Sequence, residues 1–352
     1  MFDLNIVSWW VPAIIGALAV VLGVLLFLGR ERRVLLVTGG VFCLLLALLA
    51  IGAGVNVHFD YFRTIGELFG QIPGGVSAAE VRAQERKGVP DKGLVVAQDI
   101  PGRESGFDAR DAQIYLPPAY FAKPKPQLPV LMMFHGDPGQ PTDWVEGGNI
   151  GVTANAYAKQ NNGTAPIIVM PDINGGVASD TECVDGSRGN AETYLTKDVR
   201  DAVIKQYSTA TDPKQWAIGG LSEGGYCAFM LGVRHPDLWT TFVDLSGLNV
   251  PDPDGTTAEK LLGGDKEAVA AYSPLEVLQQ PNAAWSTLGG WFAVGAQDAA
   301  SVITAVKQGA AGAQQAGITT ELKVDPGDHS FYFWSAAMAE AFPWVAQRLG
   351  LP

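Results

Sequence analysis

The chain opens with two long runs of apolar positions without charge, residues 7–29 and 34–59. As a helix, the first run would rise about 35 Å, and the hydrocarbon core of a bilayer is about 30 Å thick. The residues between the runs, 30–33, are too few for anything but a tight turn. The pattern therefore predicts a two-helix transmembrane hairpin over residues 1–59, with spans of about 7–29 and 34–56.

The arginines of this hairpin indicate its orientation. All three arginines of the first 59 residues lie in the turn at 30–33, and arginine is enriched on the cytoplasmic side of a membrane. The turn is therefore predicted to be cytoplasmic, so that both termini and everything from about Asp60 onward are extracytoplasmic. Trp9 and Trp10 suit an outer interfacial belt. A cleaved signal peptide is not expected, because its positive charges would precede the apolar run.

Beyond a predicted juxtamembrane linker at 60–92, short β-rich runs alternate with helix-compatible stretches, as in βα units. Eight strands with helices from the third onward predict an α/β-hydrolase fold for residues 93–352, a central, mostly parallel eight-stranded sheet with flanking helices. A Rossmann domain is the rival, but no GxGxxG follows a strand. The predicted strands are Leu94–Ile100, Ala112–Leu116, Val130–His135, Ile167–Pro171, Gln215–Ile218, Thr241–Leu245, Trp291–Val294 and Thr319–Val324. The predicted helices are Val152–Gln160, Tyr194–Tyr207, Gly224–Arg234, Ala300–Ala316 and Phe331–Leu349.

Composition and charge narrow the partners and cofactors. The chain has 36 acidic residues against 24 Lys and Arg, a net charge of −12 that repels nucleic acid. Its 47% hydrophobic content excludes a disordered chain. Three cysteines without a CxxC pair offer no four-ligand zinc site and at most one disulfide. We therefore expect a folded protein with no nucleic-acid partner, no metal and no organic cofactor.

A candidate nucleophile, Ser222, stands in the sequence GLSEG at 220–224, directly after a predicted strand and at the start of a predicted helix. On such a strand-to-helix turn, G-x-S-x-G is typical of a serine nucleophile held in strained backbone, with glycines that let neighbouring backbone come close. The alternative is a helix-capping serine in a glycine-rich turn. We expect Ser222 to be the catalytic serine.

A serine nucleophile needs a base, and in this fold the base follows it in the chain. Of the four histidines, only His329 follows Ser222 in a loop after a late strand. His58 lies in or beside the second apolar run, and His235 is better explained as the end of a helix. We therefore expect His329 to be the general base.

The base in turn needs an orienting carboxylate, placed between the serine and the histidine in the chain. Asp298 lies just past the seventh predicted strand and is the favoured acid. Glu276 and Asp328 are the alternatives.

Acyl transfer also needs backbone N–H donors aimed at the developing oxyanion. The usual sources are the residue after the nucleophile and the loop after the third strand, which here give Glu223 and Asp137. His135 is expected to fix that loop rather than to transfer a proton. Because both donor residues carry carboxylates, the mouth of the site is expected to be acidic and to disfavour anionic substrates.

Three motifs together resemble the putative esterase family of α/β hydrolases, which joins esterase D-type enzymes to the mycolyltransferases of mycobacterial and corynebacterial envelopes. The motifs are FHGD at 134–137, GLSEGG at 220–225 and GDHSFYFW at 327–334. The segments 180–185 and 192–198 are similar to the family's stretch between the fourth strand and the next helix. The similarity covers about Gln113 to Trp344.

This resemblance implies that Ser222 is the nucleophile, His329 the base and Asp298 or a Glu the acid, and that Asp137 and Glu223 form the oxyanion hole. Mycolyltransferases are secreted without a membrane hairpin and more often use Glu as the acid. The chain therefore looks like a membrane-anchored actinobacterial relative, and the resemblance does not specify a mycolyl substrate.

Cys183 and Cys227 are predicted to form a disulfide. Cys183 falls in the loop after the fourth strand and Cys227 in the first turn of the nucleophile helix, and both elements should meet at the C-terminal edge of the sheet. Export to an oxidising compartment would make the bridge persist. Cys43, inside the second apolar run, has no eligible partner. Two buried free thiols are the alternative.

The sequence thus predicts a membrane-anchored, extracytoplasmic serine esterase or acyltransferase that works through an acyl-enzyme on cell-envelope acyl esters, such as those of a lipid or glycolipid. Candidates for an apolar wall around the acyl chain are Trp144, Phe331, Tyr332 and Trp334. The rival function is a catalytically silent hydrolase-fold scaffold, or a subunit of an envelope complex whose hairpin docks a membrane-protein partner.

Overall fold

The predicted hairpin and the predicted catalytic domain fall into separate units of the computed structural model. The first unit comprises Met1–Ile72 with Ser330–Tyr332, and the second comprises Pro73–His329 with Phe333–Pro352. The stretch predicted as a linker, 60–92, is therefore divided between the two units. The structure describes residues 5–28, 33–69, 71–176, 179–251 and 256–352.

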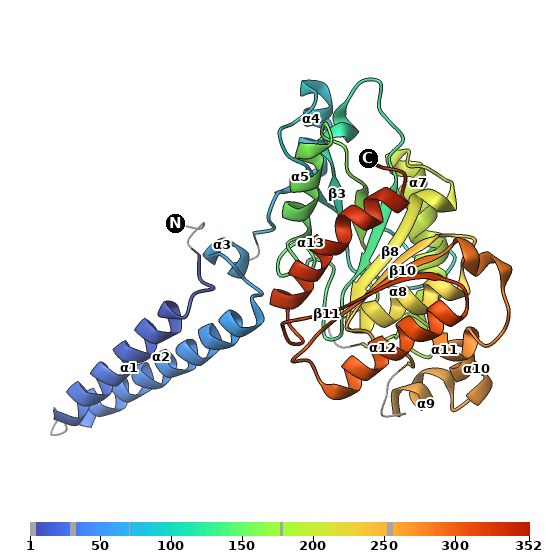
Figure 1. Cartoon of the computed structure of the whole chain (residues 1–352). Helices are drawn as coiled ribbons and strands as arrows, with labels where there is room; N and C mark the ends of the chain where they lie inside the picture. The colour runs from blue at the N-terminus through green and yellow to red at the C-terminus, as the bar shows by residue number, and fades with distance from the viewer. Residues whose placement is uncertain (1–4, 29–32, 70, 177–178, 252–255) are drawn as a thin grey trace. The chain divides into compact units, whose positions relative to one another are not determined.

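Two apolar helices, α1 (Trp10–Leu28) and α2 (Arg33–Phe59), lie side by side in the first unit (Figure 1). Both are long and apolar enough to cross a membrane, and almost none of their surface is buried inside the protein. Helices with so much exposed apolar surface suggest anchoring in a membrane. They run antiparallel, with Gly54 facing Trp9, Gly16 facing Ala50, and Gly23 facing Cys43.

The first helix begins at Trp10, three residues after the predicted start of the apolar run. Residues 30–32, which carry two of the three arginines used to orient the hairpin, lie outside the described residues. The orientation of the hairpin therefore stays a prediction. A third, short helix follows α2, namely α3 (Ile65–Leu68).

The second unit is built on a nine-stranded sheet with the order β1-β2-β3-β5-β4-β8-β9-β10-β11. All eight predicted strands are present, and β3 alone runs antiparallel to both of its neighbours. The ninth, two-residue strand β1 was not predicted; it pairs with β2 at the edge of the sheet. The strands are β1 (Gly75–Val76), β2 (Leu94–Gln98), β3 (Ala112–Leu116), β4 (Val130–Phe134), β5 (Ile167–Met170), β8 (Trp216–Leu221), β9 (Thr241–Leu245), β10 (Gly289–Gly295) and β11 (Thr319–Asp325). A separate two-stranded sheet joins β6 (Asp185–Gly186) to β7 (Gly189–Asn190).

Along the chain, the helices after α3 lie between the strands of the sheet, except α13, which follows the last strand. They comprise α4 (Ala78–Lys87), η1 (Pro118–Phe121), α5 (Ile150–Gln160), α6 (Ala191–Thr193), η2 (Tyr194–Val199), α7 (Arg200–Tyr207), η3 (Pro213–Gln215), α8 (Glu223–Arg234), α9 (Thr256–Leu262), α10 (Lys266–Ala271), α11 (Pro274–Val277), η4 (Ala283–Thr287), α12 (Ala300–Gln315) and α13 (Phe331–Arg348). The five predicted helices correspond to α5, the α6–η2–α7 segment, α8, α12 and α13.

The order of the strands reverses its direction between β4 and β8. From β4 the chain moves through α5 to β5 on one side, whereas from β8 it moves through α8 to β9 and then to β10 and β11 on the other. Because crossovers between parallel strands are right-handed, α5 and α8 lie on opposite faces of the sheet. Such a reversal leaves a crevice at the carboxyl ends of the two strands, where ligands of α/β proteins bind.

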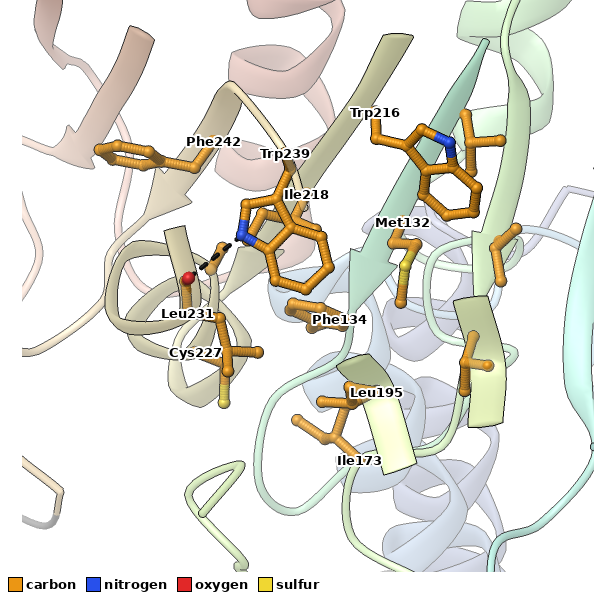
Figure 2. Packing of buried hydrophobic residues seen from close by; sticks show 14 of the residues in the cluster. Met132, Phe134, Ile173, Leu195, Trp216, Ile218, Cys227, Leu231, Trp239 and Phe242 are labelled. Carbon is orange, nitrogen blue, oxygen red and sulfur yellow. Dashed lines mark hydrogen bonds between the residues drawn. The ribbon is translucent and has the colours of Figure 1, made fainter. Parts of the chain in front are cut away.

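The core lies between the central strands and α8. Figure 2 shows Met132 and Phe134 of β4 and Ile218 of β8 packed with Leu231 and Trp239. The indole N–H of Trp239 donates to the carbonyl of Leu231 at 3.1 Å, so this large ring is buried without an unpaired polar atom. Since α8 packs against both β8 and β9, its first turn is held rigidly above the end of β8.

Candidate active site

Ser222 stands on a sharp turn between β8 and α8. Its backbone angles, φ 54° and ψ −121°, are unusual for a residue with a side chain. The turn brings Gly220 and Gly224 so close that a Cβ added to Gly220 would lie 2.1 Å from the carbonyl oxygen of Gly224. A Cβ on Gly224 would lie 2.3 Å from the carbonyl oxygen of His135. The G-x-S-x-G spacing is thus required by close backbone contacts around the serine.

His329 and Asp298 meet Ser222 at the same edge of the sheet. The Nε2 atom of His329 lies 3.0 Å from Ser222 Oγ, and its Nδ1 atom lies 2.9 Å from Asp298 Oδ2. Asp298 comes from the loop between β10 and α12, and His329 from the loop between β11 and α13. The structure therefore brings the three predicted catalytic residues together in the geometry of a serine, a base and an orienting acid.

The carboxylate of Asp298 is held in its charged form. Burial alone would raise its pKa, but the hydrogen bond from His329 and the charge of that ring hold the pKa below its usual value. The second oxygen, Oδ1, accepts the N–H of Ala299 at 2.7 Å. An ionised Asp298 keeps the proton of His329 on Nδ1, which leaves Nε2 free to accept the hydroxyl proton of Ser222. Glu276, an alternative acid, lies instead on α11 and pairs with Gln279.

Two residues outside the triad contact the His329–Asp298 pair. The indole N–H of Trp334 donates to Ser246 Oγ at 3.2 Å, and the Ser246 side chain helps to hold the pKa of the Asp298 carboxyl below its usual value. The ring of Trp334 also packs edge-on against the His329 ring, with 4.8 Å between centroids. His329, Asp298, Ser246 and Trp334 therefore form a closed ring of contacts. Ser246 was not predicted; its only sequence signal is its position directly after β9.

The structure buries two of the four candidates for the apolar wall, Trp144 and Trp334. Trp144 is fully buried, and its indole N–H donates to the carbonyl of Phe134 at 2.8 Å. It supports the end of β4 and cannot contact a substrate. Trp334 is only 5% exposed and packs on His329. Tyr332 is 66% exposed, whereas Phe331 is largely buried, and contact of Phe331 with an acyl chain stays a prediction.

The loop after β4 passes directly beside the nucleophile. A Cβ on Gly136 would lie 3.2 Å from Ser222 Cβ, so the next residue, Asp137, is close to the serine. Glu223 is the first residue of α8, where helix N–H groups have no partner within the helix. Throughout the described ranges, neither the Asp137 nor the Glu223 N–H has a hydrogen-bond acceptor. Both predicted oxyanion donors are therefore available near Ser222.

His135 holds the peptide that carries one of these donors. Its Nδ1 atom lies 2.8 Å from the carbonyl oxygen of Gly136, and because a carbonyl only accepts, Nδ1 carries the proton. This carbonyl belongs to the same peptide unit as the Asp137 N–H, so fixing one group fixes the direction of the other. His135 is fully buried, and its Nε2 atom lies 3.2 Å from Asp172 Oδ1. The same carboxylate oxygen forms an ion pair with Arg110 at 2.6 Å.

The side chains beside the predicted oxyanion donors are acidic. Carboxylate oxygens of Asp180, Glu182 and Glu223 lie within 4.8 Å of one another. The Glu223 carboxyl accepts the side-chain amide of Asn174 at 2.8 Å and the N–H of Glu182 at 3.1 Å. Burial, and then the neighbouring charges of Asp180 and Asp137, raise its pKa to about 8. The raised pKa favours the protonated form of Glu223, which reduces the negative charge next to Ser222.

A disulfide joins Cys183 to Cys227, with the two Cα atoms 5.7 Å apart. It links the nucleophile helix to the loop that donates to the Glu223 carboxyl, so it supports the surroundings of Ser222. In this loop Asp180, Glu182 and Cys183 all have positive φ angles. Cys43 of α2 is a free thiol.

Comparison with known proteins identifies relatives of the chain and of its fold. The chain is 34% identical over 343 residues to an uncharacterised protein of Corynebacterium glutamicum, an alignment that covers 93% of this chain and 79% of that protein. Among solved structures, a ferulic acid esterase has a TM-score of 0.63 at 20% identity, covering 73% of this chain and 99% of its own. The S-formylglutathione hydrolase of Agrobacterium tumefaciens has a TM-score of 0.61 at 19% identity, covering 74% and 97%.

At such low identities, the two solved structures show a shared fold only. The family is shown by the sequence itself. Residues 108–345 match the family model described as "Putative esterase", a range that contains β4, β8 and all three members of the triad. The chain therefore belongs to the putative esterase family of α/β hydrolases.

Proposed function

We propose that this protein is a membrane-anchored, extracytoplasmic serine esterase or acyltransferase that acts on acyl esters of the cell envelope. The observation that carries the proposal is the line of contacts from Ser222 Oγ to His329 Nε2, at 3.0 Å, and from His329 Nδ1 to Asp298 Oδ2, at 2.9 Å. A buried, ionised acid, a base and a serine in strained backbone together form an activated nucleophile.

The reaction follows from these groups. The Ser222 oxygen attacks the carbonyl carbon of an ester while His329 Nε2 takes the hydroxyl proton, and the N–H groups of Asp137 and Glu223 stabilise the oxyanion. The proton on His329 then passes to the departing alkoxide, which leaves an acyl group on Ser222. Water or a second hydroxyl attacks this acyl-enzyme by the same route in reverse. The ferulic acid esterase and the S-formylglutathione hydrolase are named for acyl esters or thioesters, in agreement with this chemistry.

The location of the substrate is inferred from the hairpin. Two exposed apolar helices anchor the chain in a bilayer, and the Cys183–Cys227 disulfide supports an oxidising, extracytoplasmic compartment for the second unit. Anchoring raises the effective concentration of esters carried by the same membrane, without any new contact. Freely diffusing esters gain nothing from it. We therefore assign the substrate to lipid or glycolipid esters of the envelope.

A fluorophosphonate probe tests the catalytic part of the proposal, because it labels only activated serines. The intact protein should be labelled at Ser222, and the variants Ser222→Ala and His329→Ala should not. An unlabelled but correctly folded wild-type protein would favour the rival function, a silent hydrolase-fold scaffold.

A further inference from the structure

The chain that leaves the second membrane helix does not run straight into a linker; it folds back onto the hairpin. Asn56 of α2 binds both backbone groups of Phe62: its side-chain oxygen accepts the Phe62 N–H at 2.9 Å, and its amide donates to the Phe62 carbonyl at 2.8 Å. The N–H of Ile6 donates to the carbonyl of Arg63 at 2.9 Å. The segment is therefore attached to the end of α2 and to the chain that precedes α1.

These contacts set the depth of the segment along the hairpin. Asn5, which precedes Trp9 by four residues, forms a β-bridge with Thr64. Thr64 then caps α3 by accepting the N–H of Glu67. Since Trp9 faces Gly54 near the end of α2, α3 lies just beyond the level of Trp9 and Trp10. Tryptophan side chains at the end of a membrane helix mark the interface between lipid and water.

The side chains of α3 are distributed in the opposite way to those of a water-facing helix. The acidic residue, Glu67, is only 8% exposed, because its carboxylate accepts the N–H of Arg63 at 2.6 Å. The apolar residues Leu68 and Phe69 are 51% and 77% exposed. At the same end of the hairpin, Trp9 and Trp10 are 65% and 52% exposed. A cluster of exposed apolar side chains around a buried acid marks an interaction surface.

We propose that residues 60–69 form a membrane-interface element, in which Leu68 and Phe69 insert into the headgroup region of the leaflet that holds Trp9 and Trp10. The inference rests on the proposed membrane anchoring of the hairpin. A lipid surface is the occupant because Leu68 and Phe69 share the end of the hairpin with the exposed Trp9, Trp10 and Phe59, and because the contacts of Phe62 and Thr64 hold the segment at that end. Aromatic and aliphatic side chains at this level gain free energy by entering the headgroup and acyl boundary.

The element shortens the stretch predicted as a linker, because residues 60–69 belong to the first unit, which extends to Ile72.

The test places a fluorescent label at single positions of the full-length protein in liposomes. The background variant is Cys43→Ala, which removes the free thiol and keeps the Cys183–Cys227 disulfide. A nitrobenzoxadiazole label is attached to a cysteine introduced by Leu68→Cys or by Phe69→Cys. The control is Ala79→Cys, at an exposed position of α4. Lipids with a nitroxide near the headgroup should quench the label at 68 and 69 several-fold more than at 79. Aqueous iodide should quench the three positions in the reverse order.

A fourth label separates this inference from the proposed anchoring. Leu18→Cys lies on the exposed face of α1, within the span. If nitroxides deep in the bilayer quench Leu18 while Phe69 behaves like Ala79, the interface element is wrong and the anchor stands. If Leu18 is not quenched either, the anchor itself is wrong. A label at 69 that is shielded from both quenchers would mean that a protein surface covers the patch, which also overturns the inference.

Discussion

The indole N–H of Trp334 donates to the hydroxyl of Ser246 at 3.2 Å, and Ser246 in turn helps to hold the pKa of Asp298 below its usual value. We propose that through this contact Trp334, a candidate for the apolar wall, orients the triad. We expect Ser246→Ala to lower kcat about ten- to a hundredfold, because a polar contact to a charged group is worth about 1.5–3 kcal/mol. Trp334→Phe removes a hydrogen bond to a neutral hydroxyl, worth about 0.5–1.5 kcal/mol, and should lower kcat by about tenfold or less. Neither change should alter KM much. Steady-state kinetics on a soluble ester measures the effect.

Matched controls exist for both substitutions. Ser273 is buried and donates one hydrogen bond to Val269 of α10, and Trp285 is buried and donates to Val233 of α8. Ser273→Ala and Trp285→Phe should leave kcat unchanged even where they lower the melting temperature. Equal losses of kcat in controls and test variants would show that Ser246 and Trp334 matter only for folding. Ser246→Ala should also shift the acid limb of the pH profile, which a purely structural change would not move.

The identity of the catalytic acid can be tested directly. Asp298→Asn keeps the shape of the side chain but permits the wrong tautomer of His329, and we expect a loss of kcat of about four orders of magnitude. Ser222→Ala and His329→Ala should reduce the rate by several orders of magnitude. The control is Glu276→Gln, at a position remote from His329, which should stay fully active. An inactive Glu276→Gln protein together with an active Asp298→Asn protein would assign the catalytic acid to Glu276 instead of Asp298.

The buried carboxyl of Glu223 predicts a pH dependence. Its pKa is raised from 4.5 to about 8, so the folded state holds a proton that the unfolded state releases between these values. Its contribution to stability is therefore fully present below pH 4.5 and is lost as the pH rises through about 8. We expect Glu223→Gln to remove this decline in chemical-denaturation measurements. We also expect the wild-type rate to fall above pH 8, as charge appears beside the oxyanion, and the variant to keep its plateau.

Reduction of the disulfide should destabilise the second unit. The cysteines are 44 residues apart, and in the chain-entropy model a closed loop of this length contributes roughly 4 kcal/mol. We expect Cys183→Ser and Cys227→Ser to lower the melting temperature equally, and the double variant no further, because each change breaks the same bond. Two alkylatable thiols at these positions in the unreduced, unfolded wild-type protein would contradict the bond.

The role of the anchor can be measured with the intact protein alone. A lipid-borne fluorogenic ester is placed either in the liposomes that hold the protein or in separate liposomes. We expect a rate many-fold higher when enzyme and substrate share a membrane, because their encounter is then confined to one surface. A water-soluble short-chain ester is the control and should give the same rate in both mixtures. No preference for the shared membrane would favour retention or partner docking as the role of the hairpin.

Much of the fold could be predicted because its signals are local. Each of the eight predicted strands contains a short apolar or β-branched run, and the core strand β4 is fully buried. The strand β1 could not be predicted, because Gly75 and Val76 form no pattern. Its existence depends on pairing with β2, nearly twenty residues later.

The residues of the candidate site also divide into those that have a local sequence signal and those that have none. Ser222, Asp298 and His329 are found from a turn motif and from their order in the chain, which the topology of the sheet imposes. Ser246 has no motif; it meets Asp298 only because β9 lies beside β10 in the sheet. Trp144 and Trp334 were only candidates for the apolar wall, because the position of an aromatic residue in a sequence does not reveal which way its ring turns; the structure buries both.

The backbone conformation of Ser222 lowers the stability of the fold at the position of the proposed nucleophile. A residue with a side chain held at φ 54° and ψ −121° destabilises the protein by on the order of 1–3 kcal/mol, whereas glycine adopts this region freely. Ser222→Gly should therefore melt at a higher temperature than wild type and be inactive, while Ser222→Ala should be inactive without the gain. A protein used only as a scaffold would be more stable with glycine here. Serine at 222 thus lowers the stability of the fold and supplies a hydroxyl, as the proposed reaction requires.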